Sequence, residues 1–150
     1  MKPKKIFIYL FIYLLLISLG CATDITKIHS NYENQDGNFI LYVSNQSPEI
    51  PTVDIFIKID DVPVLHKFFK AYKFNRPPGH NPQEFRFQFN PGKHRIYAET
   101  QKGKTKIDET FEIKNKNWAV IDFWYNKKQG NKYNSPTFTF EISNKPIMFL

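Results

Sequence analysis

A chain of 150 residues has room for one domain. Its composition is 41% hydrophobic and 17% aromatic, with 15 Phe, which excludes a disordered stalk and indicates a globular domain with an aromatic core. The net charge of +7 includes three lysines within the first five residues, and the remainder carries 18 basic and 14 acidic residues, or +4, spread singly along the chain. Such a mixed surface predicts no nucleic-acid partner.

The first 20 residues have the layout of an export signal. A basic head is followed by an apolar run from Ile6 to Ile17, and the small residue Gly20 precedes Cys21. The run is shorter than the roughly 20 apolar residues that a membrane-spanning helix needs. Cys21 is the single cysteine of the chain, so it cannot form an internal disulfide. An uncleaved anchor, or a signal in which the cysteine is incidental, is the alternative.

On Gly20 and Cys21 the leader resembles the type II signal of bacterial lipoproteins, whose cysteine becomes lipid-modified. Ser18 departs from that pattern, which usually has Leu, Val or Ile at this position. The resemblance implies a signal peptide over 1–20, fatty acyl chains such as palmitate on Cys21, a tether up to residue 37, and a domain over 38–150. It also implies a lipid anchor in the cell envelope. Ala22 after the cysteine resembles an outer-membrane address, and the side of the membrane stays open.

From residue 38 onward the apolar residues recur with a period of two, the pattern of half-buried strands. The clearest case is Val53, Ile55, Ile57 and Ile59. Strands are expected over 39–43, 53–59, 62–74, 85–89, 94–99, 107–113, 118–125 and 138–142, with a short helix as the alternative for 62–74 and a bulge at Glu109. Pro, Gly and Asn turns separate them. The chain is therefore predicted to be all-β, an antiparallel β-sandwich of seven to eight strands, Ig-like or fibronectin-III-like.

Two stretches in the first half of this domain carry a second resemblance. Residues 53–64 read VDIFIKIDDVPV, and residues 89–96 read FNPGKHRI. They resemble small bacterial surface β-domains of the PEGA kind, in which a strand ends in Asp-Gly and a Pro-Gly-Lys-His turn precedes a later strand. Asp61 stands where that family has Gly, and the family's Gly-Tyr ending is not evident. The resemblance implies an accessory envelope domain and transfers no site.

The sequence predicts no catalytic or metal site. None of the serines lies in a Gly-x-Ser-x-Gly elbow. The adjacent carboxylates Asp60-Asp61 and Asp108-Glu109 would point to opposite sides of a strand. The histidines lack metal-binding spacings, although a cluster in space of His66, His80 and His94 stays open. The chain is therefore predicted not to be an enzyme and to hold no cofactor.

The stretch from Trp118 to Tyr125 is apolar on both sides except at Asp122, which predicts a central strand, or one whose outer aromatics form a surface. Trp118 and Trp124 share one side of this strand, and Tyr125 takes the other. Asp122 is either a polar contact within an aromatic patch or a carboxylate at a strand edge or bonded to water. The candidate binding residues are Trp124, Tyr125, Trp118, Asp122, Tyr97 and Tyr42. In a chain this rich in Phe, the alternative is that such aromatics are core.

Three functions are consistent with these features. The favoured one is a lipid-anchored, non-enzymatic envelope protein that binds another envelope or surface protein. The second is a carbohydrate-binding module that stacks a glycan on two or three coplanar exposed aromatics. The third is an inhibitor of a secreted hydrolase, with the proline-rich loop 75–82 as a stiff inserting loop.

Overall fold

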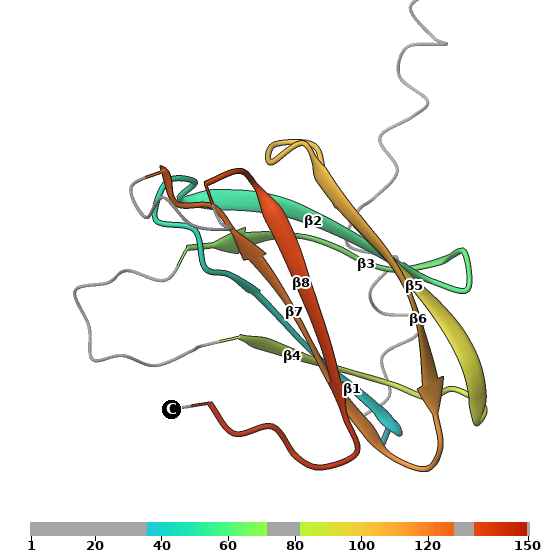
Figure 1. Cartoon of the computed structure of the whole chain (residues 1–150). Coiled ribbons are helices and arrows are strands. Elements are labelled where there is room, and N and C mark those ends of the chain that lie inside the picture. Colours follow the sequence, from blue (N-terminus) through green and yellow to red (C-terminus); the bar gives the residue numbers. More distant parts are fainter. Residues whose placement is uncertain (1–35, 72–81, 128–133, 150) are drawn as a thin grey trace, which may run out of the picture.

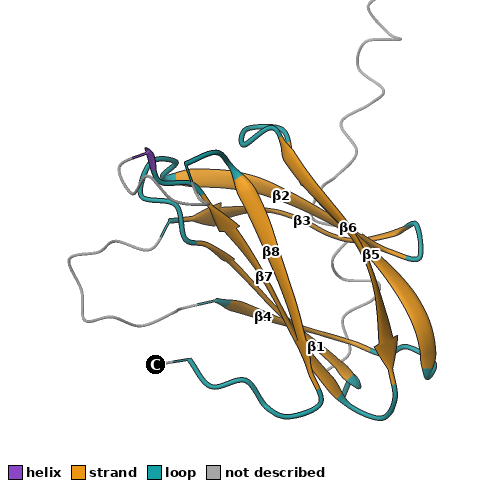
Figure 2. Ribbon diagram, viewed as in Figure 1, coloured by secondary structure: helices purple, strands orange, loops and turns teal. Residues whose placement is uncertain are grey.

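The computed structural model of the chain describes residues 36–71, 82–127 and 134–149. The predictions for the leader, for Cys21, for nearly all of the tether and for most of the proline-rich loop lie outside these residues. Within them the chain consists almost entirely of strands and loops (Figure 2). No helix of this part of the chain has the length and apolarity to cross a membrane.

The described residues form eight strands in two sheets that pack face to face (Figure 1). Sheet A has the order β4 (Gln83–Phe87), β1 (Phe39–Asn45), β7 (Asn117–Trp124) and β8 (Thr137–Ser143). Sheet B has the order β3 (Val62–Lys70), β2 (Thr52–Ile59), β5 (Gly92–Thr100) and β6 (Thr105–Ile113). The predicted all-β sandwich is confirmed, and its strands pair antiparallel except for β1 and β7, which are parallel.

The strand order differs from that of a constant-type immunoglobulin domain. There the first and second strands lie in the same sheet, together with the fourth and fifth. Here β1 lies between β4 and β7, while β2 belongs to the other sheet. The likeness to immunoglobulin and fibronectin domains therefore lies in the two-sheet architecture, and the strand order is the chain's own.

The alternation read from the sequence corresponds to the two sides of each sheet. Val53, Ile55, Ile57 and Ile59 of β2 all point into the core and are fully buried. Of the ambiguous stretch 62–74, residues Val62–Lys70 form the strand β3 and not a helix, and residues 72–74 lie outside the described residues. The bulge expected at Glu109 was wrong, because β6 pairs with β5 in unbroken register and Glu109 lies exposed on an edge strand. The irregularity lies instead in β3, where Val64 is an extra residue opposite the step from Ile57 to Lys58 of β2.

Aromatic rings link the two sheets within the core. Phe39 of β1 stacks on Phe111 of β6, with ring centroids 5.1 Å apart, and Phe111 meets Phe140 of β8 edge-on at 5.8 Å. The largest fully buried side chains are Phe39, Phe69, Phe87, Phe123, Ile40, Leu41, Ile55, Ile57, Ile59, Leu65, Ile96 and Ile113. These interactions hold the two sheets together.

The β2–β3 turn shows how the sequence defines a hairpin. Only Asp60 and Asp61 separate the paired residues Ile59 and Val62. Both have positive φ, 51° and 63°, as a type I′ turn requires. Asp tolerates this backbone conformation better than most residues, so the two acidic residues predicted as a turn fit it.

Candidate binding surface

The outward side chains of β1 and β7 form the middle of one molecular surface. The parallel pairing sets Ile40 beside Trp118, Tyr42 beside Val120, and Ser44 beside Asp122. We define the outer face of sheet A by its outward residues, which are Ile40, Tyr42, Ser44, Glu84, Arg86, Trp118, Val120, Asp122, Trp124, Thr137, Thr139, Glu141 and Ser143. The sequence prediction that Trp118 and Trp124 share one side is confirmed, and that side faces away from the core.

The centre of this face is apolar although it lies outside the core. Ile40 is 1% exposed and Val120 is 8% exposed, whereas the outer face of an antiparallel sheet is usually polar. Tyr42, Trp118 and Trp124 are half-buried around them. The outer face of sheet A therefore has the composition of a packing surface.

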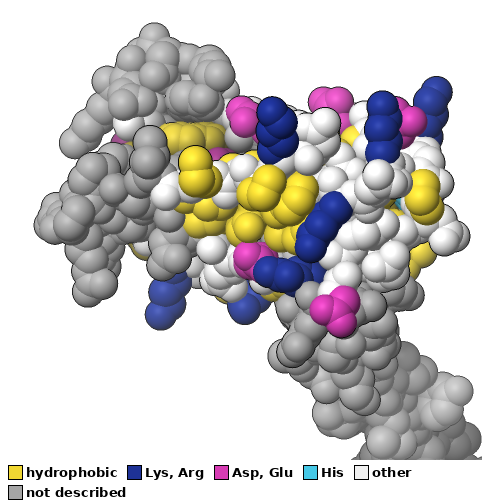
Figure 3. Space-filling model, turned by 90° about the horizontal axis from the view of Figure 1, so that it is seen from below, with side chains coloured by type: hydrophobic (Ala, Val, Ile, Leu, Met, Phe, Trp, Pro, Cys, Tyr) yellow, Lys and Arg dark blue, Asp and Glu magenta, His cyan; other side chains and the backbone are white. Residues whose placement is uncertain are grey.

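Charged side chains border this apolar centre. Glu84 and Arg86 of β4 form an ion pair at one side, and Glu141 lies on β8 at the other. The Nζ atom of Lys116 lies 5.8 Å from the ring centroid of Trp118. Figure 3 shows hydrophobic side chains gathered in the middle of the lower side of the molecule, with Lys, Arg, Asp and Glu around them. An apolar centre with a charged rim is the usual anatomy of a protein interface.

One aromatic side chain already packs on this face. The ring of Phe149, in the segment that follows β8, meets Tyr42 edge-on with centroids 4.8 Å apart. This segment leaves the lower end of β8 and runs toward the β4 side of the sheet (Figure 1). Burial of Tyr42, its hydrogen bond to Glu84 and the charge of that carboxylate raise the pKa of Tyr42 above its ordinary value. The phenol is thus neutral and held in place beneath the Phe149 ring.

Asp122 lies near the end of β7, an interior strand of sheet A, and is 6% exposed. The Ser44 hydroxyl donates a hydrogen bond to its Oδ1, and Gln46 Nε2 donates one to Ser44 Oγ at 2.6 Å. Asp122 is therefore not at a strand edge, which rules out that interpretation. It is a hydrogen-bonded carboxylate between Trp124 and Val120, and it fixes the positions of β1 and β7 relative to each other at the upper end of the face.

Two of the predicted binding residues do not belong to this face. Tyr125 follows β7 on the inward side and packs against the core, because the period of two places it opposite to Trp124. Tyr97 lies on the outer face of sheet B, where its hydroxyl bonds to Glu99 at 2.8 Å. The structure thus brings together Tyr42, Trp118, Asp122 and Trp124, and it separates Tyr97 and Tyr125 from them.

The outer face of sheet B has a different character. Its aromatics are interleaved with charges: Lys58 Nζ lies 5.3 Å from the Phe56 ring centroid and 5.7 Å from that of Tyr97. Arg95 makes a two-pronged ion pair with Asp108, through Nε at 2.7 Å and Nη2 at 2.5 Å. The adjacent carboxylate of Glu109 lies on the opposite side of β6, so these acids do not work as a pair. This face reads as a solvated mixed-charge surface.

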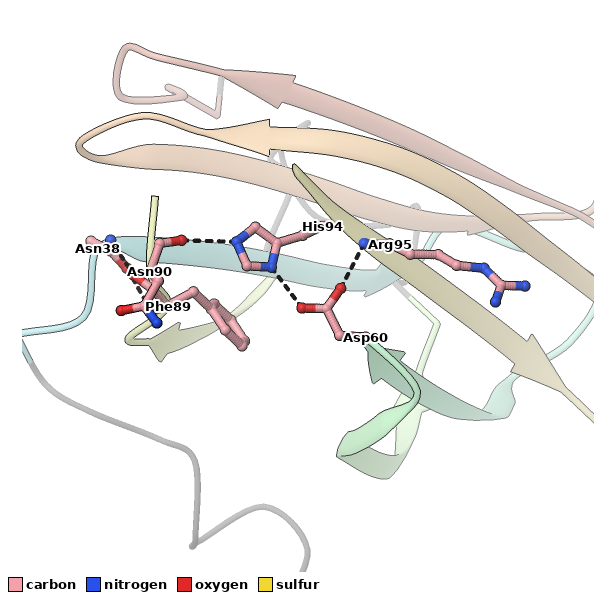
Figure 4. Close-up of polar contacts among 6 residues, drawn as sticks. All are labelled: Asn38, Asp60, Phe89, Asn90, His94 and Arg95. Carbon is pink, nitrogen blue, oxygen red and sulfur yellow. Dashed lines mark hydrogen bonds and ion pairs between the residues drawn. The ribbon is translucent and has the colours of Figure 1, made fainter. Parts of the chain in front are cut away.

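Sequence reasoning missed a polar link between two turns (Figure 4). His94 Nδ1 lies 2.7 Å from Asp60 Oδ2, and His94 Nε2 lies 2.8 Å from the backbone oxygen of Asn90. Asp60 Oδ1 also accepts the Arg95 backbone N–H at 2.9 Å. Burial raises the pKa of Asp60, but the bonds from Arg95 and His94 and the His94 charge outweigh it and hold that pKa below its ordinary value. The link joins the β2–β3 turn to the turn before β5.

The imidazole of His94 packs between rings as well. Its centroid lies 5.5 Å from that of Phe89 and 5.7 Å from that of Phe111. Asn38 holds Phe89 by two bonds, since Nδ2 donates to the Phe89 oxygen and Oδ1 accepts the Phe89 N–H. Both ring nitrogens of His94 have polar partners, Asp60 and the Asn90 oxygen, so the imidazole connects the two turns and has a structural role. The signal in the sequence was the pair of stretches behind the second resemblance, because Asp60 lies in one and His94 in the other.

The chain matches no protein-family model, and neither a curated protein nor a solved structure matches it. Among the described residues, no three His, Cys, Asp or Glu side chains come together as metal ligands. His66 packs against Phe56 on sheet B, at a centroid distance of 5.3 Å, and His94 is tied to Asp60, so these two do not form the cluster left open by the sequence. The outer face of sheet A is therefore the candidate binding surface.

Proposed function

We propose that the chain is a lipid-anchored, non-enzymatic protein of the cell envelope whose β-sandwich binds another envelope protein. The anchor is proposed on Cys21, after removal of residues 1–20, with the lipid in the outer membrane. The binding surface is the outer face of sheet A. The partner contributes an apolar segment that carries an aromatic side chain.

The observation that carries this proposal is the group of half-buried rings Tyr42, Trp118 and Trp124 on the outside of the sandwich, which surrounds the buried apolar pair Ile40 and Val120. Large aromatic side chains around a dry centre are the residues that contribute most to binding energy in protein interfaces. The Phe149 ring on Tyr42 shows the kind of side chain that this face accepts. These features support a protein partner with a hydrophobic, aromatic contact.

A glycan finds less support on the same surface. Trp118 and Trp124 lie six residues apart on one strand, which separates them by about 20 Å. The Tyr42 hydroxyl is engaged by Glu84, and Phe149 packs on its ring. Stacking of sugar rings needs a row of coplanar exposed aromatic rings, and Tyr42, Trp118 and Trp124 do not form such a row. The loop proposed for hydrolase inhibition lies mostly outside the described residues.

The partner is sought by crosslinking in intact cells with the full chain, tagged within the tether. The test variant is Trp118→Ala/Trp124→Ala. The matched control, Phe56→Ala/Phe68→Ala, removes two aromatic rings from the outer face of sheet B instead. One protein should be recovered in near-equal amount with the wild type and the control, and at least about tenfold less with the test variant. Equal recovery with all three proteins, each folded by circular dichroism, would contradict the proposed surface.

The anchor is tested separately. Cells that express the full chain are fed labelled palmitate, and the label should appear on the wild type and be lost in Cys21→Ser. Incorporation that persists in Cys21→Ser, or none in the wild type, would contradict the lipid anchor without bearing on the binding surface.

A further inference from the structure

Each sheet has two edge strands, and three of these four edges carry features that prevent the addition of another strand. β3 contains Pro63, which has no N–H to donate, and the next residue, Val64, is the extra residue of an irregularity in its pairing with β2. β4 is only five residues long. β6 has the carboxylate of Glu109 on the side of the core, opposite Ile96. Such features are the means by which natural sheets protect their edges.

The fourth edge, β8, lacks these features. Its seven residues, TFTFEIS, contain no proline and one charged side chain, Glu141. It pairs with β7 in regular register over its whole length, and no described strand pairs with its other side. The segment after it runs toward β4, away from this edge (Figure 1). Ile142, whose side chain points to the core side, is 39% exposed there. β8 is thus a regular strand with alternating polar and apolar residues, and its only contact with β6 is across the core, through rings such as Phe111 and Phe140, so among the described strands its outer edge is unpaired.

We infer that β8 pairs antiparallel with β8 of a second copy of this chain. A twofold axis can pass through the pair at Thr139, Phe140 or Glu141. An axis at Glu141 would place the two like charges opposite each other, which is unfavourable. An axis at Thr139 would set Ile142 beyond the end of the partner strand. An axis at Phe140 sets Ile142 against Phe138 of the second copy and Glu141 against Thr139, so it covers the exposed Ile142 and opposes no like charges.

A second copy is favoured over a foreign strand because β8 is complementary to itself in this register. The contact is isologous, so it closes after two chains and does not propagate into a fibre. Since directly opposed residues of antiparallel strands point to the same side, the outer faces of both A sheets would lie on one side of a continuous sheet. The two copies would then present their Trp118 and Trp124 on the same side of that sheet, separated by the two β8 strands, and a partner with two apolar segments could bind both.

The register is tested with charges at the two ends of β8, Thr137 and Ser143, which oppose each other across the axis. Thr137→Glu/Ser143→Glu creates two like-charge pairs, one at each end of the strand pair. Thr137→Lys/Ser143→Glu creates two opposite-charge pairs at the same positions. The swapped variant, Thr137→Glu/Ser143→Lys, controls for the position of each charge. The full chain is studied in detergent by light scattering coupled to size-exclusion chromatography, which separates protein mass from detergent mass.

The wild type should have twice the mass of one chain. The double-glutamate variant should dissociate about tenfold more readily than either mixed-charge variant, because the axis makes each repulsion occur twice. Both mixed-charge variants should remain dimeric. A wild type with the mass of one chain at the highest concentration reached would overturn the inference. So would equal dissociation of all three variants, which would place any dimer contact away from β8. Neither result depends on whether the outer face of sheet A binds a partner.

Discussion

Replacing His94 with alanine should lower the free energy of unfolding by about 3 kcal/mol. The variant loses the contacts to Asp60 and to the Asn90 oxygen, at about 1 kcal/mol for each hydrogen bond. It also loses ring contacts to Phe89 and Phe111, at about 0.5 kcal/mol or more each. The Asn90 oxygen then has no side-chain partner. Urea unfolding of the full chain, followed by the fluorescence of the two tryptophans, measures the loss.

A double-mutant cycle isolates the contact between the two turns. Asp60→Gly removes the carboxylate and keeps a residue suited to the φ of 51°. Asp61→Gly, at the φ of 63° in the same turn, is the matched control and should leave the stability nearly unchanged. We expect His94→Ala and Asp60→Gly to be non-additive by about 1 kcal/mol. Additivity within about 0.3 kcal/mol would refute the reasoning that these side chains act as one link.

The same cycle has a pH dependence. The pKa of Asp60 is lower in the folded chain than in the unfolded one, because the bonds from Arg95 and His94 outweigh the effect of burial. The carboxylate therefore contributes stability above its unfolded pKa, about 4, and loses that contribution as the pH falls through the folded value. The difference between the wild type and Asp60→Gly should shrink as the pH is lowered below about 4. A difference in stability that grows as the pH is lowered would show that the pKa of Asp60 is not lowered by folding.

Three further outcomes can be measured by the same unfolding assay. Gly103→Ala should cost about 1–3 kcal/mol, because a Cβ there would meet the Phe123 ring, and an unchanged midpoint would contradict this packing. Phe39→Ala should cost about 3–5 kcal/mol, because this ring is fully buried between the sheets; a loss under 1 kcal/mol would show that the site collapses. Asp54→Asn should destabilise the domain at pH 7 and progressively less as the pH falls below about 4: burial raises the pKa of Asp54, but hydrogen bonds from Thr100 and the β5–β6 turn hold it below its ordinary value. Destabilisation that stays the same as the pH falls through the acid range would contradict that assignment.

The strands could be predicted from the sequence because each one has a local signature. Val53 to Ile59 alternates strictly, and Asp60-Asp61 marks a two-residue turn. The order of the strands in the sheets has no such signature. Nothing near Phe39 indicates that its neighbours are β4 on one side and a parallel β7 on the other. Pairings between distant segments depend on the whole core. Local sequence patterns therefore predict a β-sandwich but not the order of its strands.

The candidate binding surface could likewise be predicted only in part. Trp118 and Trp124 were correctly placed on one side of their strand, since that follows from the period of two alone. Tyr97 was grouped with them because it also points outward, but outward from β5 means the other side of the sandwich. Tyr125 was included although the same period sets it inward, and there it packs on the core. The link between Asp60 and His94 was missed because two turns 34 residues apart meet only in the folded chain.

The parallel pair of β1 and β7 has a consequence for the order in which the chain can fold. Sheet B contains two hairpins of adjacent strands, β2–β3 and β5–β6, which can close as soon as each has been made. Sheet A has one such pair, β7–β8, but its β1 cannot pair with β7 early, because Ser44 must wait for Asp122, 78 positions later. Closing so large a loop is slow, so the strand next to the proposed membrane anchor should be among the last to find its place. A chain interrupted before Asn117 would leave β1 with β4 alone, and its apolar side chains would be open to proteases and chaperones.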